Sequence, residues 1–189
     1  MKWAFILSTA ILCFALPYGI SAQRALSGQR GLQVTAGTVN GLNPQDGFHV
    51  GVAFTQYSKH SNRWVFGVEY LEKRYPYKDI YIPQSQFTAD AGYYLSFLSD
   101  RRKTFFFSIG ASAVGGYETV NWNNKILYDG ATVNNKDGFI YGGALSLEME
   151  AYLTDRIVLL ASARERFLAG STVGKLNTLF GLGIKFIIN

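Results

Sequence analysis

Histidine and cysteine, the side chains that most often carry catalysis or bind metals, are scarce in this chain. The histidines are His49 and His60, and the one cysteine is Cys13. A hydrolase needs a base beside an activated serine and an orienting carboxylate, and neither histidine has such neighbours in a recognisable pattern. Two well-separated histidines also lack the spacing of a zinc site. The sequence therefore predicts no catalytic residue, no metal site and no cofactor.

Many of the charged residues recur at alternate positions of apolar segments. Side chains on a strand alternate between its two faces, so these charges lie opposite the large apolar residues. Buried charges must be paired, and carboxylates and cations are nearly balanced here. We therefore predict an internal network of ion pairs; a narrow pore or a proton-responsive gate is the alternative. The predicted network comprises Glu69, Asp90, Glu148, Glu150, Arg164, Arg166 and Lys185, with Lys73 as a further candidate.

Eight alternating segments must position these charges. In the last of them, Leu176, Phe180 and Leu182 share one face, whereas Asn177 and Lys185 lie on the other. Each segment is long enough for a tilted membrane strand of about 9–11 residues. Clusters of Gly, Asn, Asp, Pro and Lys separate the segments. The predicted strands cover about 31–40, 48–58, 63–73, 86–98, 104–114, 139–152, 156–167 and 176–188.

The connections between these segments alternate in length. Segments 41–47, 74–85, 115–138 and 168–175 are longer than the intervening turns. Outer-membrane barrels have long outside loops and short periplasmic turns, with both termini in the periplasm. We therefore predict an all-β fold, an eight-stranded antiparallel up-and-down transmembrane β-barrel of the outer-membrane type. A soluble lipocalin-like barrel is the alternative.

The first 22 residues have the layout of a secretory signal peptide. Lys2 gives a positive start, residues 3–20 carry no charge, and Ser21-Ala22 offers a cleavage site before Gln23. A membrane anchor is the alternative, although Pro17 and Gly19 interrupt the apolar run. We therefore expect a single barrel domain at 23–189, without cysteine, in the bacterial outer membrane.

Composition fits this expectation. Aromatic residues make up 15% of the chain, which has 20 glycines and 4 prolines, as suits aromatic girdles around a tight barrel interior. The mild net charge of +5 indicates solubility and contact with anionic lipid head groups rather than binding of nucleic acid, for which no motif is visible. Basic residues near the short turns are predicted to contact head groups or an acidic periplasmic partner. They are Lys59, Arg63, Arg101, Arg102 and Lys103.

Two long connections are rich in aromatic residues, which often mark binding surfaces when they are exposed. We expect these residues to contact a partner, to pack together as a lid, or to form an extension of the hairpin outside the membrane. The candidates are Tyr75, Tyr77 and Tyr81 in the first connection, and Tyr117, Trp122 and Tyr128 in the second.

A series of short motifs spans nearly the whole chain after the signal peptide. The motifs are QRAL (23–26), GLQVTAG (31–37), YKDIYIP (77–83), TADAGY (88–93), GYE (116–118), LYDGA (127–131), FIYG (139–142) and AYLTDR (151–156). No single motif is specific, and none is catalytic. In this order, the motifs resemble the TraO family of conjugative transposon proteins.

The resemblance implies a part of a conjugation apparatus, a type IV secretion-like system, that contacts other Tra proteins at the donor outer membrane. An eight-stranded barrel is too narrow for DNA, which favours an anchor, a collar subunit or a surface-contact element. Two alternatives are a free-standing barrel of the adhesin or envelope-defence type and an enzyme that modifies lipid A. The sequence leaves the oligomeric state open.

Overall fold

The computed structural model describes residues 25–78, 80–124, 126, 131–132, 137–171 and 174–188. The predicted signal peptide, its cleavage site between Ala22 and Gln23, and Tyr128 lie outside these residues. Among the described residues, no helix has the length and hydropathy of a membrane span.

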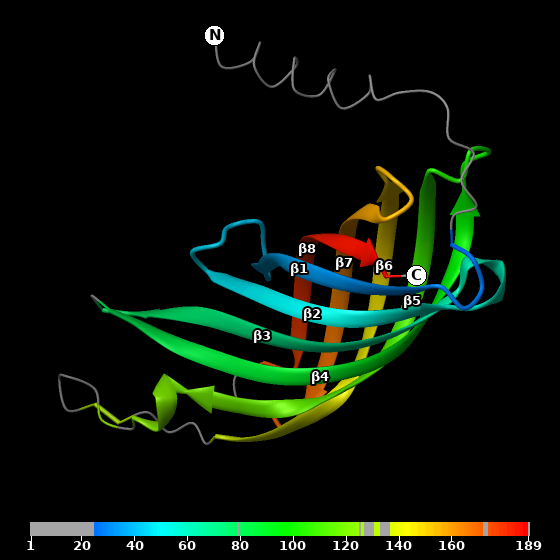
Figure 1. Cartoon of the computed structure of the whole chain (residues 1–189). Coiled ribbons are helices and arrows are strands. Elements are labelled where there is room, and N and C mark those ends of the chain that lie inside the picture. The colour runs from blue at the N-terminus through cyan, green and yellow to red at the C-terminus, as the bar shows by residue number, and fades with distance from the viewer. Residues whose placement is uncertain are drawn as a thin grey trace, which may run out of the picture.

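The described chain folds into a closed barrel of eight strands, as predicted (Figure 1). Each strand pairs antiparallel with the next, and β8 pairs with β1. Closure leaves no strand edge along the body of the sheet. The strands are β1 (Arg30–Val39), β2 (Gly47–Tyr57), β3 (Arg63–Tyr77), β4 (Ile80–Ser99), β5 (Phe105–Val120), β6 (Gly138–Tyr152), β7 (Ile157–Ala169) and β8 (Leu176–Ile187).

Three of these strands are longer than the sequence pattern indicates. The pairing of β3 with β4 continues past Arg74↔Pro83 to Tyr77↔Ile80, and β5 runs on to Val120. The prediction that 74–85 and the start of 115–138 are loops is therefore wrong. The prolines that indicated a loop are tolerated because they lie where this hairpin has no outer neighbour. The other strands end within about two residues of the predicted positions.

The strands are staggered around the barrel, as closure requires. A row of directly paired residues starts at Arg30 and, after one circuit of the barrel, returns to β1 near Asn40. The N–H of Asn40 donates to the backbone oxygen of Thr178, and its side-chain Oδ1 accepts from the N–H of Thr178. One irregularity in register, a bulge between Ser96 and Leu98, lies on β4. We call the end of the barrel that carries the short turns, the start of β1 and the end of β8 the terminal end. The opposite end is the loop end.

The wall of the barrel is apolar on its outside. Mid-strand residues such as Val68 and Leu182 are 62% and 71% exposed. Aromatic side chains gather on the outer face toward both ends; Trp64 packs on Tyr93 toward the terminal end, at a centroid distance of 4.8 Å. Toward the loop end, the rings of Phe48, Tyr70, Phe87, Trp122, Tyr117 and Phe139 form adjacent pairs. An apolar band between two aromatic girdles is the pattern of a membrane barrel.

The interior is crowded enough to require glycine at particular positions. A Cβ at Gly37 would lie 1.9 Å from the backbone oxygen of Phe180 and 2.6 Å from Nε2 of His49. At the terminal end the interior is closed by a buried layer of mostly apolar side chains. This layer comprises Ala25, Tyr57, Phe106, Tyr152, Val158, Leu160 and Ile187.

Candidate functional site

The first charged layer of the interior lies directly above this apolar floor and centres on Arg63. Its guanidinium donates hydrogen bonds to Glu148 at 2.5 Å, to Glu150 at 3.1 Å and to Ser108 at 3.0 Å. Lys185 donates to Glu150 and, at 3.2 Å, to the hydroxyl of Tyr57. All four charged side chains are buried. Two cations thus face two carboxylates in the lower layer.

The second charged layer lies closer to the loop end and centres on Glu69. The Nη2 atom of Arg166 lies 2.5 Å from Glu69 Oε1, and Nη1 of Arg164 lies 3.6 Å from Glu69 Oε2. Arg164 Nη1 is also 3.7 Å from Asp90 Oδ1. His49 is buried beside them, with Nδ1 3.5 Å from Glu69 Oε2. Two cations again face two carboxylates in the upper layer.

A third polar cluster occupies the mouth at the loop end. Glu118 Oε2 accepts hydrogen bonds from the side chains of Gln84, Gln86 and Ser171 at 2.7–2.8 Å. Ser171 follows β7, so the connection to β8 reaches across the mouth to this carboxylate. Lys73 is buried on the inner face at the same end. The interior therefore holds two charge-balanced layers above the floor and a polar cluster at the mouth.

The structure brings the seven residues of the predicted internal network together inside the barrel. Glu148, Glu150 and Lys185 lie in the lower layer. Glu69, Asp90, Arg164 and Arg166 lie in the upper layer. The inward placement of these residues could be predicted from the alternation of side chains along single strands, because that alternation depends only on whether residue numbers are odd or even.

Arg63 was assigned to the wrong place by the sequence analysis. It was grouped with Lys59 as a periplasmic docking residue, yet its side chain is 0% exposed inside the barrel. Arg63 is the first residue of β3, and it has the inward parity of Glu69. The prediction placed Arg63 with the turn residues because it lies next to a turn, although its parity indicated the inward face. Lys59, Arg101, Arg102 and Lys103 lie exposed in the turns of the terminal end.

Glu118 and Tyr57 are interior residues that the sequence analysis missed. Glu118 lies in a segment taken for a loop, so no strand parity was assigned to it. Tyr57 donates a hydrogen bond to Glu150 at 2.8 Å. The alternation of segment 48–58 places it on the inward face with His49, and this signal was available. His60 lies exposed in the turn between β2 and β3.

The aromatic candidates at the loop end lie on strand extensions and a helical turn rather than in long loops. Tyr75 and Tyr77 are on β3, Tyr81 is on β4, and Tyr117 is on β5. Trp122 lies in the short helical turn η2 (Asn121–Asn123) and packs edge-on against Phe87. Figure 1 shows the β3–β4 hairpin projecting past the ends of β1 and β2.

Each edge of the projecting hairpin carries a proline at a position where the backbone nitrogen points outward. The N–H of Arg74 donates to Asp46, so it points away from β4. The backbone nitrogen of residue 76, two residues further along the strand, points the same way as that of Arg74, and Pro76 has no N–H. Pro83 lies opposite Arg74, so its nitrogen also points outward, toward the edge beyond Val120. Proline at both edges hinders strand addition, which leaves side chains as the means of contact.

No group of three or more potential metal-ligating side chains occurs in the described part of the chain. The barrel offers buried ion pairs and exposed aromatic surfaces, and the interior carboxylates described above are engaged with cations or with side-chain amides.

Solved barrel structures similar to this one share little sequence with it. Neisserial surface protein A is 15% identical, with a TM-score of 0.49, covering 85% of this chain and 97% of that chain. Ail of Yersinia pestis, solved with the heparin analogue sucrose octasulfate, is 10% identical with a TM-score of 0.48, covering 85% and 100%. The N-terminal barrel domain of Pseudomonas aeruginosa OprF is 12% identical with a TM-score of 0.45, covering 85% and 98%.

No curated protein matches this chain. The family model described as conjugative transposon protein TraO matches residues 26–188, which is most of the chain. This confirms the resemblance seen in the ordered motifs. The chain belongs to the TraO family of conjugative transposon proteins.

Proposed function

We propose that this protein is a non-enzymatic outer-membrane component of a conjugative DNA-transfer apparatus, in which it acts as an anchor, collar or surface-contact element. The observation that carries the proposal is the filled barrel: an apolar wall encloses balanced, buried charge layers. Such a barrel fits a bilayer, but its interior leaves no path for a nucleic acid. Family membership supports the role in transfer.

The direction of insertion follows from the ends of the barrel. Short turns and the strand termini face the periplasm in barrels of this class, and the longer connections face outside. The terminal end, with its exposed basic turns, would then meet periplasmic transfer proteins. The β3–β4 hairpin, on which Tyr81 is 65% exposed, would project from the cell surface.

The basic turns are the stronger candidate for docking other Tra proteins. Arg101, Arg102 and Lys103 are exposed in one turn, and Lys59 lies in a neighbouring one. Charges of one sign at an interface rim steer association with an acidic partner. We expect no direct contact of this protein with nucleic acid.

The two ends can be tested separately in a donor that lacks the chromosomal copy. One complementing variant reverses Arg101, Arg102 and Lys103 to Glu, and the other replaces residues 74–83 by a two-residue turn. We expect the charge reversal to lower transfer frequency at least tenfold while the barrel still assembles in the outer membrane. A matched control reverses Arg74, whose charge is engaged with Glu72 at 2.9 Å. Wild-type transfer by the Arg101–Arg102–Lys103 variant would refute docking at the basic turns.

A second candidate is a free-standing surface barrel of the adhesin or envelope-defence type. The projecting aromatic hairpin favours it, because exposed aromatic residues mark contact sites. This candidate predicts that the purified barrel binds a host or envelope ligand by itself and that shortening the hairpin abolishes binding. It also predicts unchanged transfer for both variants above.

A further inference from the structure

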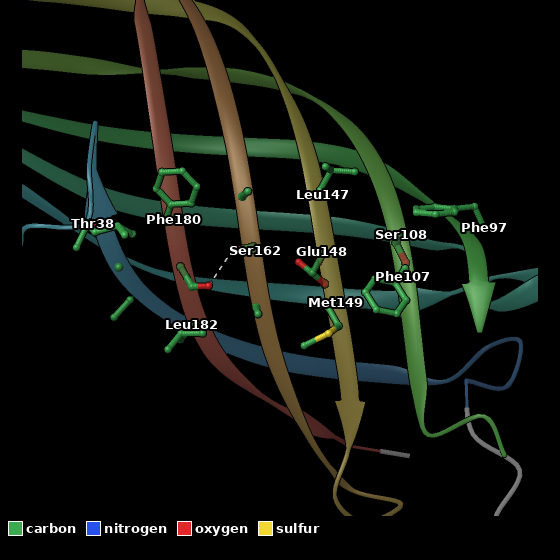
Figure 2. A pocket seen from close by; sticks show the side chains of 16 residues that line it. Thr38, Phe97, Phe107, Ser108, Leu147, Glu148, Met149, Ser162, Phe180 and Leu182 are labelled. Carbon is green, nitrogen blue, oxygen red and sulfur yellow. Dashed lines mark hydrogen bonds between the residues drawn. The ribbon is translucent and has the colours of Figure 1, made fainter. Parts of the chain in front are cut away.

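The apolar outer wall of the barrel contains a groove of about 690 Å³ over β7 (Figure 2). Its floor is formed by the small side chains of Ala161 and Ala163. Larger side chains of the neighbouring strands surround the alanines, and the groove extends to Thr38 on β1 and to Phe107 and Phe97 on β5 and β4. Directly opposite the alanines lie Leu147 and Met149 on β6, and Phe180 and Leu182 on β8.

A carboxylate lies at the rim of this groove. Glu165 occupies the next outward position of β7 after Ala163, toward the loop end. It lies opposite the exposed Leu145 on β6 and opposite Thr178 on β8, whose hydroxyl donates a hydrogen bond to Oε2 at 2.6 Å. Phe167 follows at the next outward position. Glu165 is therefore a half-buried acid on the outer wall, one step inside an exposed aromatic ring.

No Lys or Arg of the described residues forms an ion pair with Glu165. Each of them lies inside the barrel, in a turn, near the end of a strand or, like Arg74, on the projecting β3–β4 hairpin. A second copy of this barrel would bring none of these side chains to the same depth in a bilayer. Ionisable groups at the lipid boundary are costly, and their presence points to a partner of opposite charge.

The lining and the rim of the groove decide what kind of partner fits. The lining is apolar over most of its area and runs on the outer wall from Thr38 on β1 to Phe107 on β5, so it suits a hydrocarbon chain. The carboxylate at the rim needs a positive charge at the lipid boundary. A lipid whose head group carries a positive charge supplies both in one molecule.

We propose that the groove binds one acyl chain of a lipid whose head group carries a primary ammonium, and that Glu165 pairs with this ammonium. The hydrocarbon lies over Ala161 and Ala163, and the ammonium donates to the carboxylate beside Thr178. The inference rests on the membrane placement proposed above. It is independent of any role in conjugation.

Native mass spectrometry of the purified barrel tests the proposal. The protein is incubated in detergent with equal amounts of phosphatidylethanolamine and phosphatidylglycerol, and the ratio of bound lipids is measured. We expect one retained phosphatidylethanolamine per barrel. In Glu165→Gln the ratio should fall about tenfold, because one charge-assisted hydrogen bond corresponds to roughly that factor. In Ala163→Phe, neither lipid should be retained.

Matched controls keep the test specific. Glu72→Gln removes an outward carboxylate that already pairs with Arg74, and Ala113→Phe enlarges an exposed alanine on β5. Both should retain the wild-type ratio. If Ala163→Phe does not fold, Ala161→Leu fills the same floor with a smaller side chain. Equal retention of both lipids by the wild type, or an unchanged ratio in Glu165→Gln, would overturn the lipid site. A barrel that fails to enter vesicles at all would instead overturn its membrane placement.

Discussion

Substitution of Arg63 by Met should destabilise the barrel severely. Arg63 is fully buried and donates to both carboxylates of the lower layer. Its removal leaves Glu148 and Glu150 facing Lys185 alone, so the layer changes from neutral to a net negative charge. Removing one partner of a buried ion pair costs about 3–5 kcal/mol, because the other charge stays buried without compensation.

A second substitution should recover part of this loss. Arg63→Met combined with Glu148→Gln leaves the pair of Lys185 and Glu150, so the layer is neutral again. We expect the loss of unfolding free energy in the double variant to be about 2 kcal/mol smaller than the sum of the losses in the two single variants. This difference lies within the range measured for coupled neighbours. The exposed pair of Arg74 and Glu72 supplies the comparison, because breaking a surface pair costs only about 0–1 kcal/mol.

Equilibrium unfolding in urea from lipid vesicles measures these free energies. The emission of Trp64, which is 49% exposed on the outer wall, reports removal from the bilayer. A cost below about 1 kcal/mol for Arg63→Met would refute the reasoning, since buried pairs cost more than that. Strictly additive single and double effects would refute it as well.

Three further predictions concern the wall, the interior and the hairpin. Val68→Arg should destabilise the inserted barrel by about 2–4 kcal/mol in the same unfolding assay, whereas Tyr81→Arg on the projecting hairpin should be neutral; equal costs would contradict the apolar band. Gly142→Ala should reduce the folded fraction, which is measured as the heat-modifiable band in gels, because the added Cβ would lie 1.8 Å from a backbone oxygen of the next strand. The control Gly115→Ala should leave the folded fraction unchanged, because its Cβ meets open space. Pro76→Val restores an outward N–H and should increase self-association in size-exclusion chromatography; an unchanged monomer would contradict edge protection by proline.

Much of the fold could be predicted because a barrel strand carries its own evidence. In β8, alternation of Leu182 and Ile184 with Gly183 and Lys185 sets both the strand and its faces without knowledge of its neighbours. The interior ion pairs follow from the same parity. Their partners do not, because the choice of Arg63 rather than Arg164 for Glu148 depends on the register between β3, β6 and β7.

The loop end resisted prediction for a different physical reason. Pro76 and Pro83 indicate loops in isolation, yet the hairpin places both nitrogens at its outer edges, where no donor is needed. Glu165 was overlooked because one acid among apolar outward positions reads as an exception to the pattern. Its meaning emerges only from the opposing Leu145 and Thr178 and from the groove beside it.

The most direct test of the central claim is conjugation frequency from a donor with an in-frame deletion of this gene. We expect transfer frequency to fall by several orders of magnitude in the deletion strain and to be restored by the wild-type gene in trans. Transfer at the wild-type frequency in the deletion strain would contradict a role in the transfer apparatus.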